Sequence, residues 1–178
     1  NFAVRAGKRF PISPLYGKID GNNGKTGLAM KVFAVSDLHL PGNQDKPMDI
    51  FGGNWTGHFE KIKENWRANV CEEDIVLIPG DISWAMNLSD ALTDLARLKD
   101  LPGKKVFIRG NHDYWWSTRS KIEAFFAAQG FCSMELVFNS AVRVGDITVC
   151  GTRGWLYNAE TPEDRKIVAR ENGRLTLS

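Results

Sequence analysis

The feature that most constrains the fold is a regular alternation of strand-like and helix-like patterns, with polar residues placed directly after the strands. Short β-branched or aromatic runs occur at residues 31–36, 74–78 and 105–108. Apolar residues at helical spacing follow each run, so strands and helices come in turn. This order predicts an α/β protein with a mainly parallel sheet.

The expected helices follow from apolar residues that recur every three or four positions. They cover residues 59–70, residues 88–98 with Ser89 or Asp90 as the N-cap, and residues 122–126 with Gly130 closing the helix. A last helix is expected from Pro162 to Arg174, after Thr161. Between the last two helices, residues 141–144 and 147–150 flank Gly145-Asp146, which is typical of a hairpin with antiparallel pairing.

The first 29 residues have a different texture from the rest. They show no sustained period of two or 3.6, so we expect residues 1–29 to be a disordered or non-native extension and residues 30–178 to form the domain. The chain begins with Asn, and Met30 directly precedes the first strand, which suggests a natural start there. The formal net charge is +2, but residues 30–178 carry 18 basic and 20 acidic residues, a net charge of −2. The domain therefore lacks the excess positive charge typical of nucleic-acid binding, and we expect no such partner.

The cysteines indicate a reducing compartment. Cys71, Cys132 and Cys150 lie far apart, form no C-x-x-C pair, and are odd in number. Such a set predicts no disulfide framework, and the expected location is the cytoplasm. No apolar run approaches the roughly 18 to 20 residues needed to cross a bilayer, so no membrane partner is expected.

The residues with chemical potential follow the three predicted strands. They are Asp37 and His39 in D-x-H, Asp81 in G-D, and Asn111, His112 and Asp113 in G-N-H-D. The carboxyl ends of parallel strands share one edge of a sheet, so these side chains are expected to converge there. Their combination of carboxylate, imidazole and amide suits Mn²⁺, Fe²⁺ or Zn²⁺.

This set of ligands predicts a site for two divalent ions. Asp81 has two oxygens and could bridge ions about 3.5 to 4 Å apart, and such a pair turns a coordinated water into a metal-bound hydroxide at neutral pH. His112 is expected to donate a proton to the leaving oxygen. Asp113 is expected to orient the His112 ring and to favour its charged form.

Three segments carry a resemblance to a known family. V-F-A-V-S-D-L-H-L, V-L-I-P-G-D-I-S and V-F-I-R-G-N-H-D-Y resemble the first three signature motifs of the calcineurin-like metallophosphoesterases, and in particular small bacterial predicted phosphohydrolases. The likeness covers about Met30 to Tyr157. It implies a β-sandwich of two mixed sheets flanked by helices. It also implies that Asp37 and His39 bind the first ion, Asp81 bridges, Asn111 binds the second, and His112 is the acid.

The resemblance is incomplete in one respect. That family completes its site with a later lone His and a G-H-x-H motif, whereas the histidines of this chain are His39, His58 and His112. The resemblance therefore implies a domain truncated at its C-terminus.

The expected function is that of a metal-dependent phosphohydrolase, which cleaves phosphomonoesters or phosphodiesters with two divalent ions, Mn²⁺ first among them, and a small phosphate-ester substrate. Two alternatives stay open: a nuclease of the same superfamily, or a catalytically impaired metal-binding fragment.

Weaker signals concern residues around this site. Arg153 could bind a substrate phosphate or form a surface salt bridge. Trp115 and Trp116 could form a stacking wall for an aromatic leaving group or pack in the core. His58 is expected to have a capping or surface role in preference to metal ligation, and residues 41–55 could form a rim or a passive connection.

Overall fold

A computed structural model gives the fold, and it describes residues 13–14, 30–44, 48–144, 147–154, 156 and 158–178. The centre of these residues is a five-stranded sheet in the order β1-β2-β3-β4-β5. β2 to β5 run parallel, and β1 pairs antiparallel with β2. The strands are β1 (Ser13–Pro14), β2 (Val32–Ala34), β3 (Ile75–Ile78), β4 (Lys104–Phe107) and β5 (Met134–Leu136). The three strands predicted from the sequence are confirmed as β2, β3 and β4.

Two edge strands were not expected. β1 belongs to the segment for which no structure was predicted, although the rest of that segment, residues 1–12 and 15–29, lies outside the described residues. β5 has only three residues and pairs with β4. Strands this short carry too little alternation to be distinguished from a loop in the sequence.

The central sheet buries both of its faces. Successive side chains of a strand point to opposite sides. In β3, Val76 and Ile78 pack in one cluster, and Ile75 and Leu77 pack in a second cluster on the other side. Such burial on both faces explains why β3 is a continuous apolar run in the sequence.

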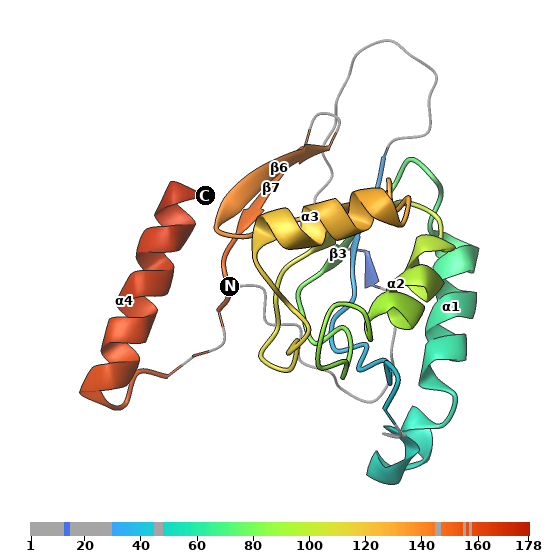
Figure 1. The fold of residues 1–178 in the computed structure, drawn as a ribbon, viewed down its shortest axis with the longest axis horizontal. Helices are drawn as coiled ribbons and strands as arrows, with labels where there is room; N and C mark the ends of the chain where they lie inside the picture. Colours follow the sequence, from blue (N-terminus) through green and yellow to red (C-terminus); the bar gives the residue numbers. More distant parts are fainter. Residues whose placement is uncertain (1–12, 15–29, 45–47, 145–146, 155, 157) are drawn as a thin grey trace.

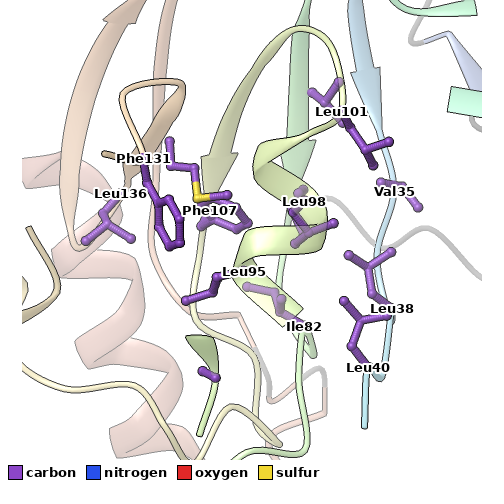
Figure 2. Close-up of a cluster of buried hydrophobic side chains, with 14 of the residues drawn as sticks. Val35, Leu38, Leu40, Ile82, Leu95, Leu98, Leu101, Phe107, Phe131 and Leu136 are labelled. Carbon is purple, nitrogen blue, oxygen red and sulfur yellow. The ribbon is translucent and has the colours of Figure 1, made fainter. Parts of the chain in front are cut away.

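Helices cover the first of these faces (Figure 1). They are α1 (His58–Asn69), α2 (Leu92–Lys99) and α3 (Arg119–Ala128). Figure 2 shows Leu95 and Leu98 of α2 lying between Phe107 of β4 and the chain that follows β2. These helices confirm the periodicity seen in the sequence.

The start of α2 corrects the expected N-cap. The helix begins at Leu92, and its cap position, Ala91, has no side-chain hydrogen bond. The Ser89 hydroxyl and the Asp90 backbone N–H instead donate to the Asn87 side-chain oxygen, at 2.6 and 3.0 Å. The polar residues thus close a turn that precedes the helix.

An antiparallel hairpin covers the second face. β6 (Ser140–Val144) pairs with β7 (Ile147–Gly151), and Val144 is opposite Ile147, as expected for a two-residue connection. Residues 145–146 lie outside the described part. The layers are therefore helices, parallel sheet and hairpin, a mixed α/β arrangement consistent with a metallophosphoesterase fold. In the described residues the second sheet is antiparallel, whereas two mixed sheets were expected.

The last helix, α4 (Pro162–Leu177), lies beside the hairpin at the edge of the molecule (Figure 1). It begins after Thr161, whose side chain forms a capping box with Asp164, and this confirms the expected start. None of its residues is buried. Across the described residues, none of the helices is both long and apolar enough to traverse a membrane.

Candidate metal centre

The segments that follow β2 and β3 run side by side beyond the ends of the strands. The Asp37 backbone N–H donates to the Gly80 carbonyl at 3.2 Å, and the His39 N–H donates to the Asp81 carbonyl at 2.9 Å. The parallel pairing of the two strands thus continues into the loops. As a result, the D-x-H and G-D motifs lie next to each other, as the sequence predicted.

Two glycines allow the third motif to approach the second. A Cβ on Gly110 would lie 2.1 Å from the backbone nitrogen of Asp81, and a Cβ on Gly80 would lie 2.5 Å from Cα of Gly110. Any side chain there would overlap the neighbouring backbone. The glycines of G-D and G-N-H-D are therefore needed because the two loops pass in direct contact.

The backbone of the candidate ligands has an uncommon conformation. Asp37, His39 and Asp81 have φ values of 57°, 43° and 52°, in the left-handed region. Among the described residues that are not glycine, only Asn139 shares this feature. Each costs about 1 kcal/mol or more relative to ordinary backbone. The concentration of this cost in the two loops marks them as a functional site.

Asp81 lies at the centre of the cluster. Its Oδ2 is 2.9 Å from Nδ1 of His112 and 3.9 Å from Nε2 of His39, and that Nε2 is 3.7 Å from Oδ1 of Asp37. One ligand atom each of His39, Asp81 and His112 can be chosen so that all lie within 4.8 Å of one another. The side chains of His39 and Asp81 are 12% and 11% exposed, whereas those of Asp37 and His112 are 44% and 37% exposed. The site thus has an inner pair and an outer pair, and the outer pair faces solvent.

The donor set fits a divalent metal ion. Ligand atoms about 2.1 Å from one ion lie about 3.0 to 4.2 Å from each other, and the 3.7 and 3.9 Å separations around Nε2 of His39 fall in this range. They are too long for hydrogen bonds. The buried Nδ1 of His39 also has no hydrogen-bond partner among the described residues. Burial lowers the pKa of His39 more than Asp81 and Asp37 raise it, so its ring is neutral at pH 7, the form that binds metals.

Asn111 lies at the same edge and is exposed. Its Nδ2 is 3.2 Å from Nδ1 of His112. The three sequence motifs therefore place all five expected residues around one point: Asp37, His39, Asp81, Asn111 and His112.

The structure corrects the role expected for Asp113. Its carboxylate is fully buried and accepts backbone N–H bonds from Gly110 at 2.7 Å, Ile82 at 2.8 Å and Asp81 at 2.9 Å. The Trp115 indole donates a further bond at 3.0 Å. The His112 ring is held by Asp81, in place of Asp113. Asp113 thus fastens the third loop to the second, and burial raises its pKa although these donors lower it.

A second buried carboxylate, Asp94 of α2, was missed in the sequence. Its Oδ2 accepts bonds from the Gly42 backbone N–H at 2.5 Å and from the Ser83 hydroxyl at 2.6 Å. Gly42 follows the first motif and Ser83 follows the second, so Asp94 fastens both loops to the helix. Burial raises its pKa. The only sequence signal was an acidic residue on the apolar face of a helix, three residues before Arg97.

Trp84 also belongs to the site and was missed. Its ring stacks on His39 with centroids 4.9 Å apart and lies 4.9 Å from the His112 ring. Trp115 and Trp116, considered as a stacking wall, are 2% and 7% exposed and pack in the core. The core alternative is therefore correct for that pair. The signal for Trp84 was its position three residues after Asp81.

The segment from Pro41 to Trp55 borders this ring cluster. It contains two 3-10 turns, η1 (Met48–Phe51) and η2 (Gly53–Trp55), while residues 45–47 lie outside the described part. The Trp84 indole donates to the Met48 sulfur at 3.4 Å. The Trp55 ring meets the His39 ring edge-on at 6.4 Å. These contacts favour the alternative that residues 41–55 form a rim of the site over the alternative of a passive connection.

A capping or surface role was expected for His58, and the surface alternative is wrong because the residue is buried. His58 lies outside the group of candidate ligands. Its Nε2 is 2.9 Å from the carbonyl oxygen of Leu38. A carbonyl oxygen only accepts, so this nitrogen carries the proton. The bond fixes the backbone between Asp37 and His39.

Arg153 lies beyond the end of β7, outside the group formed by the ligands. Burial and the charge of Arg109 lower its pKa, while the charge of Glu171 raises it. Its role as a substrate-binding residue stays a prediction.

Comparison with known proteins identifies the family of this chain. The sequence model of the calcineurin-like phosphoesterases matches residues 30–171, and the chain belongs to this family. The family hydrolyses phosphoesters with divalent metal ions, and the cluster around Asp81 can hold a metal. No curated protein matches the chain. Among solved structures, a protein of unknown function from Aquifex aeolicus is 20% identical, with a TM-score of 0.44 over 79% of this chain and 73% of that one.

Proposed function

We propose that this chain hydrolyses small phosphate esters, monoesters or diesters, at a site for two divalent ions, with Mn²⁺ the first candidate. The observation that supports this most directly is the position of Asp81, whose carboxylate lies between the rings of His39 and His112. A carboxylate has two oxygens and can bind two ions at once, one of them together with His39.

The other candidate ligands divide around Asp81. Asp37 and His39 would hold one ion, and Asn111 would hold the other. Bound divalent ions lower the pKa of coordinated water and neutralise charge on the phosphoryl oxygens. The protein contributes the fixed positions, because the loops that carry these residues are fastened to each other by Asp113 and to α2 by Asp94.

His112 would act as the proton donor to the leaving oxygen. Its Nδ1 donates to Oδ2 of Asp81 at 2.9 Å, and its backbone N–H donates to Oδ1 of the same carboxylate at 2.9 Å. Two bonds to one carboxylate hold the ring in one orientation. The side chain is 37% exposed, so the ring also reaches solvent and hence a substrate.

The test compares Asp81→Asn with Asp100→Asn, an exposed change at the end of α2. Hydrolysis of p-nitrophenyl phosphate and of its bis ester is measured with Mn²⁺, and bound metal is measured by elemental analysis. We expect Asp81→Asn to abolish hydrolysis and lower metal content, while Asp100→Asn matches the original chain. Full activity of Asp81→Asn with normal metal content would remove the bridging assignment.

His112→Ala separates the two roles open to this residue. As a proton donor, its loss should lower kcat by about 10² to 10⁴-fold with metal content retained. Loss of metal would instead make His112 a ligand. If the original chain binds Mn²⁺ and cleaves neither ester, it is a metal-binding fragment, and cleavage of single-stranded DNA would favour a nuclease.

A further inference from the structure

Aromatic rings from three loops form a row across the metal centre. Trp84 contacts both imidazoles, with its ring centroid 4.9 Å from that of His39 and 4.9 Å from that of His112. The row continues beyond His39 with Trp55 and beyond His112 with Tyr114, in each case at 6.4 Å. The two imidazoles of the candidate site are therefore flanked by larger aromatic rings.

Tyr114 differs in exposure from the residues beside it. Asp113, Trp115 and Trp116 are buried, whereas Tyr114 is 49% exposed. The Tyr114 backbone N–H donates to the His112 carbonyl at 2.9 Å, and the Trp116 N–H donates to the Asp113 carbonyl at 3.2 Å. These bonds fix the backbone of Tyr114 beside His112. The Tyr114 ring thus presents an accessible surface next to the residue proposed to protonate the leaving oxygen.

Exposed apolar side chains are concentrated at the same edge of the central sheet. Among the described residues, the large hydrophobic side chains that are exposed lie on α4 and in the loops that follow β2, β3, β4 and β5. Those in the loops are Ile50, Phe51, Met86, Tyr114 and Phe138. A single exposed apolar residue is ordinary, but several on the loops that carry a polar site are typical of a ligand-binding rim. This rim favours a substrate whose organic part is apolar.

We propose that Tyr114 binds an aromatic leaving group, so that the substrates are aryl phosphate esters. Aromatic rings pack on one another with centroids about 4.5 to 7 Å apart, and the Tyr114 ring is 6.4 Å from the His112 ring. A ring packed on Tyr114 would therefore lie next to an oxygen that receives its proton from His112, which favours an ester oxygen attached directly to the ring. Hydrolysis breaks the bond between phosphorus and this oxygen, water supplies the oxygen that replaces it on phosphorus, and the products are a phenol and phosphate. The role of the ring as leaving group rests on the proposed function, whereas its binding beside the metal centre does not.

The first experiment measures binding without turnover. Benzylphosphonate has a CH₂ group in place of the ester oxygen of phenyl phosphate, so it is not hydrolysed, and methylphosphonate lacks the ring. Each is titrated by calorimetry into the chain loaded with Mn²⁺. We expect the original chain to bind benzylphosphonate more tightly than methylphosphonate. Tyr114→Ala should weaken the binding of benzylphosphonate by about three- to tenfold, the size of one aromatic contact, and leave methylphosphonate unchanged. An equal effect on the two ligands, or no effect on either, would overturn the subsite.

Two further variants make this result specific. Tyr114→Phe keeps the ring and should bind benzylphosphonate as the original chain does. A loss as large as that of Tyr114→Ala would assign the binding to the hydroxyl and overturn the ring contact. Ile167→Ala is the matched control, because it also removes an exposed apolar side chain but lies on α4. It should leave both affinities unchanged.

Two measurements distinguish the aromatic subsite from its alternatives. Elemental analysis should give the same Mn²⁺ content for Tyr114→Ala and the original chain, and a loss of Mn²⁺ would make Tyr114 a support of the metal centre instead. Cyclohexylmethylphosphonate has a saturated ring of similar size and should bind more weakly than benzylphosphonate. Equal affinity of the original chain for the two would overturn the aromatic assignment in favour of any apolar group.

A kinetic experiment then tests the substrate class. With Mn²⁺ present, kcat/KM is measured for phenyl phosphate, ethyl phosphate and adenosine monophosphate. Each variant is compared with the original chain on the same substrate, which cancels the different reactivities of the leaving groups. Tyr114→Ala should lower kcat/KM for phenyl phosphate by about three- to tenfold and leave ethyl phosphate unchanged. A larger loss with adenosine monophosphate, whose base is separated from the ester oxygen by ribose, would overturn the aryl assignment in favour of nucleotides.

The two experiments separate failure of the subsite from failure of the proposed function. If the original chain binds benzylphosphonate through Tyr114 but cleaves none of the esters, the proposed function fails and the aromatic subsite stands. If the chain cleaves the esters but binds the two phosphonates equally, the subsite fails and the proposed function stands.

Discussion

Replacement of Asp113 by Asn distinguishes a structural carboxylate from a catalytic one. In the structure, Oδ2 accepts N–H bonds from Asp81 and Gly110, and Oδ1 accepts bonds from Ile82 and the Trp115 indole. Asparagine keeps one acceptor oxygen and puts an NH₂ group in place of the other. In either orientation of the amide, at least two buried N–H donors lose their acceptor, and Oδ1 also accepts the Ser83 backbone N–H at 3.3 Å.

The magnitude follows from these two donors. A buried donor without a partner costs about 1 to 3 kcal/mol. Burial raises the pKa of Asp113, which means that its buried charge is unfavourable. Loss of that charge in asparagine therefore offsets part of the cost of the unpaired donors. We therefore expect the free energy of unfolding to fall by about 2 to 4 kcal/mol. With a urea m-value of about 2 kcal/mol/M, the midpoint should fall by about 1 to 2 M.

The assay is urea unfolding of metal-free protein, so that bound metal does not add to the stability. Tryptophan fluorescence is a suitable signal because Trp115 and Trp116 are buried beside Asp113. Asp100→Asn, exposed at the far end of α2, is the control and should stay within about 0.5 kcal/mol of the original chain.

One result would refute the reasoning. If Asp113→Asn keeps its urea midpoint but loses hydrolysis with metal retained, the carboxylate acts on the chemistry, as the sequence first suggested. A lowered midpoint without metal supports its role in fastening the loops.

The remaining predictions concern three other residues. Asp94→Ala removes the acceptor shared by two loops and should lower the free energy of unfolding in urea by about 2 to 4 kcal/mol. An unchanged urea midpoint would show that Asp94 is not needed to fasten the two loops. Trp84→Ala removes two ring contacts worth about 0.5 to 1.5 kcal/mol each and should weaken Mn²⁺ affinity about tenfold, whereas Trp84→Phe should weaken it less. Equal Mn²⁺ affinities of the two variants and the original chain would show that Trp84 does not position the His39 and His112 rings. Burial lowers the pKa of Lys105 to about 8 from 10.5. Between these values the unfolded chain binds more protons, so the free energy of unfolding should rise with pH, by on the order of 1 to 3 kcal/mol relative to Lys105→Met. A difference between the two proteins that does not change with pH would contradict this.

Much of the fold was predictable because its signals are local. β3 is apolar because both faces of the sheet are covered, and α1 shows its buried face through Ile62 and Trp66. The candidate ligands were predictable for a related reason. The parallel order of the strands brings their carboxyl ends together, so Asp37, Asp81 and His112 meet whatever the details of the loops.

The supporting residues were not predictable in the same way. Asp94 binds Gly42, which is 52 positions away, and Asp113 binds the Ile82 backbone, 31 positions away. Neither distance is set by a local period. Sequence proximity suggested that Asp113 would serve the adjacent His112, whereas its side chain turns toward the backbone of another loop.

The sequence by itself thus determined most of the order of strands and helices, the family, and the candidate metal ligands. The tertiary structure decided which carboxylate holds His112, which tryptophan lies on the ligand rings, and which buried acids fasten the loops. The physical reason is the close passage of the loops at Gly80 and Gly110. At that contact, backbone N–H groups of one loop need acceptors from another, and the position of those acceptors depends on the folded chain as a whole.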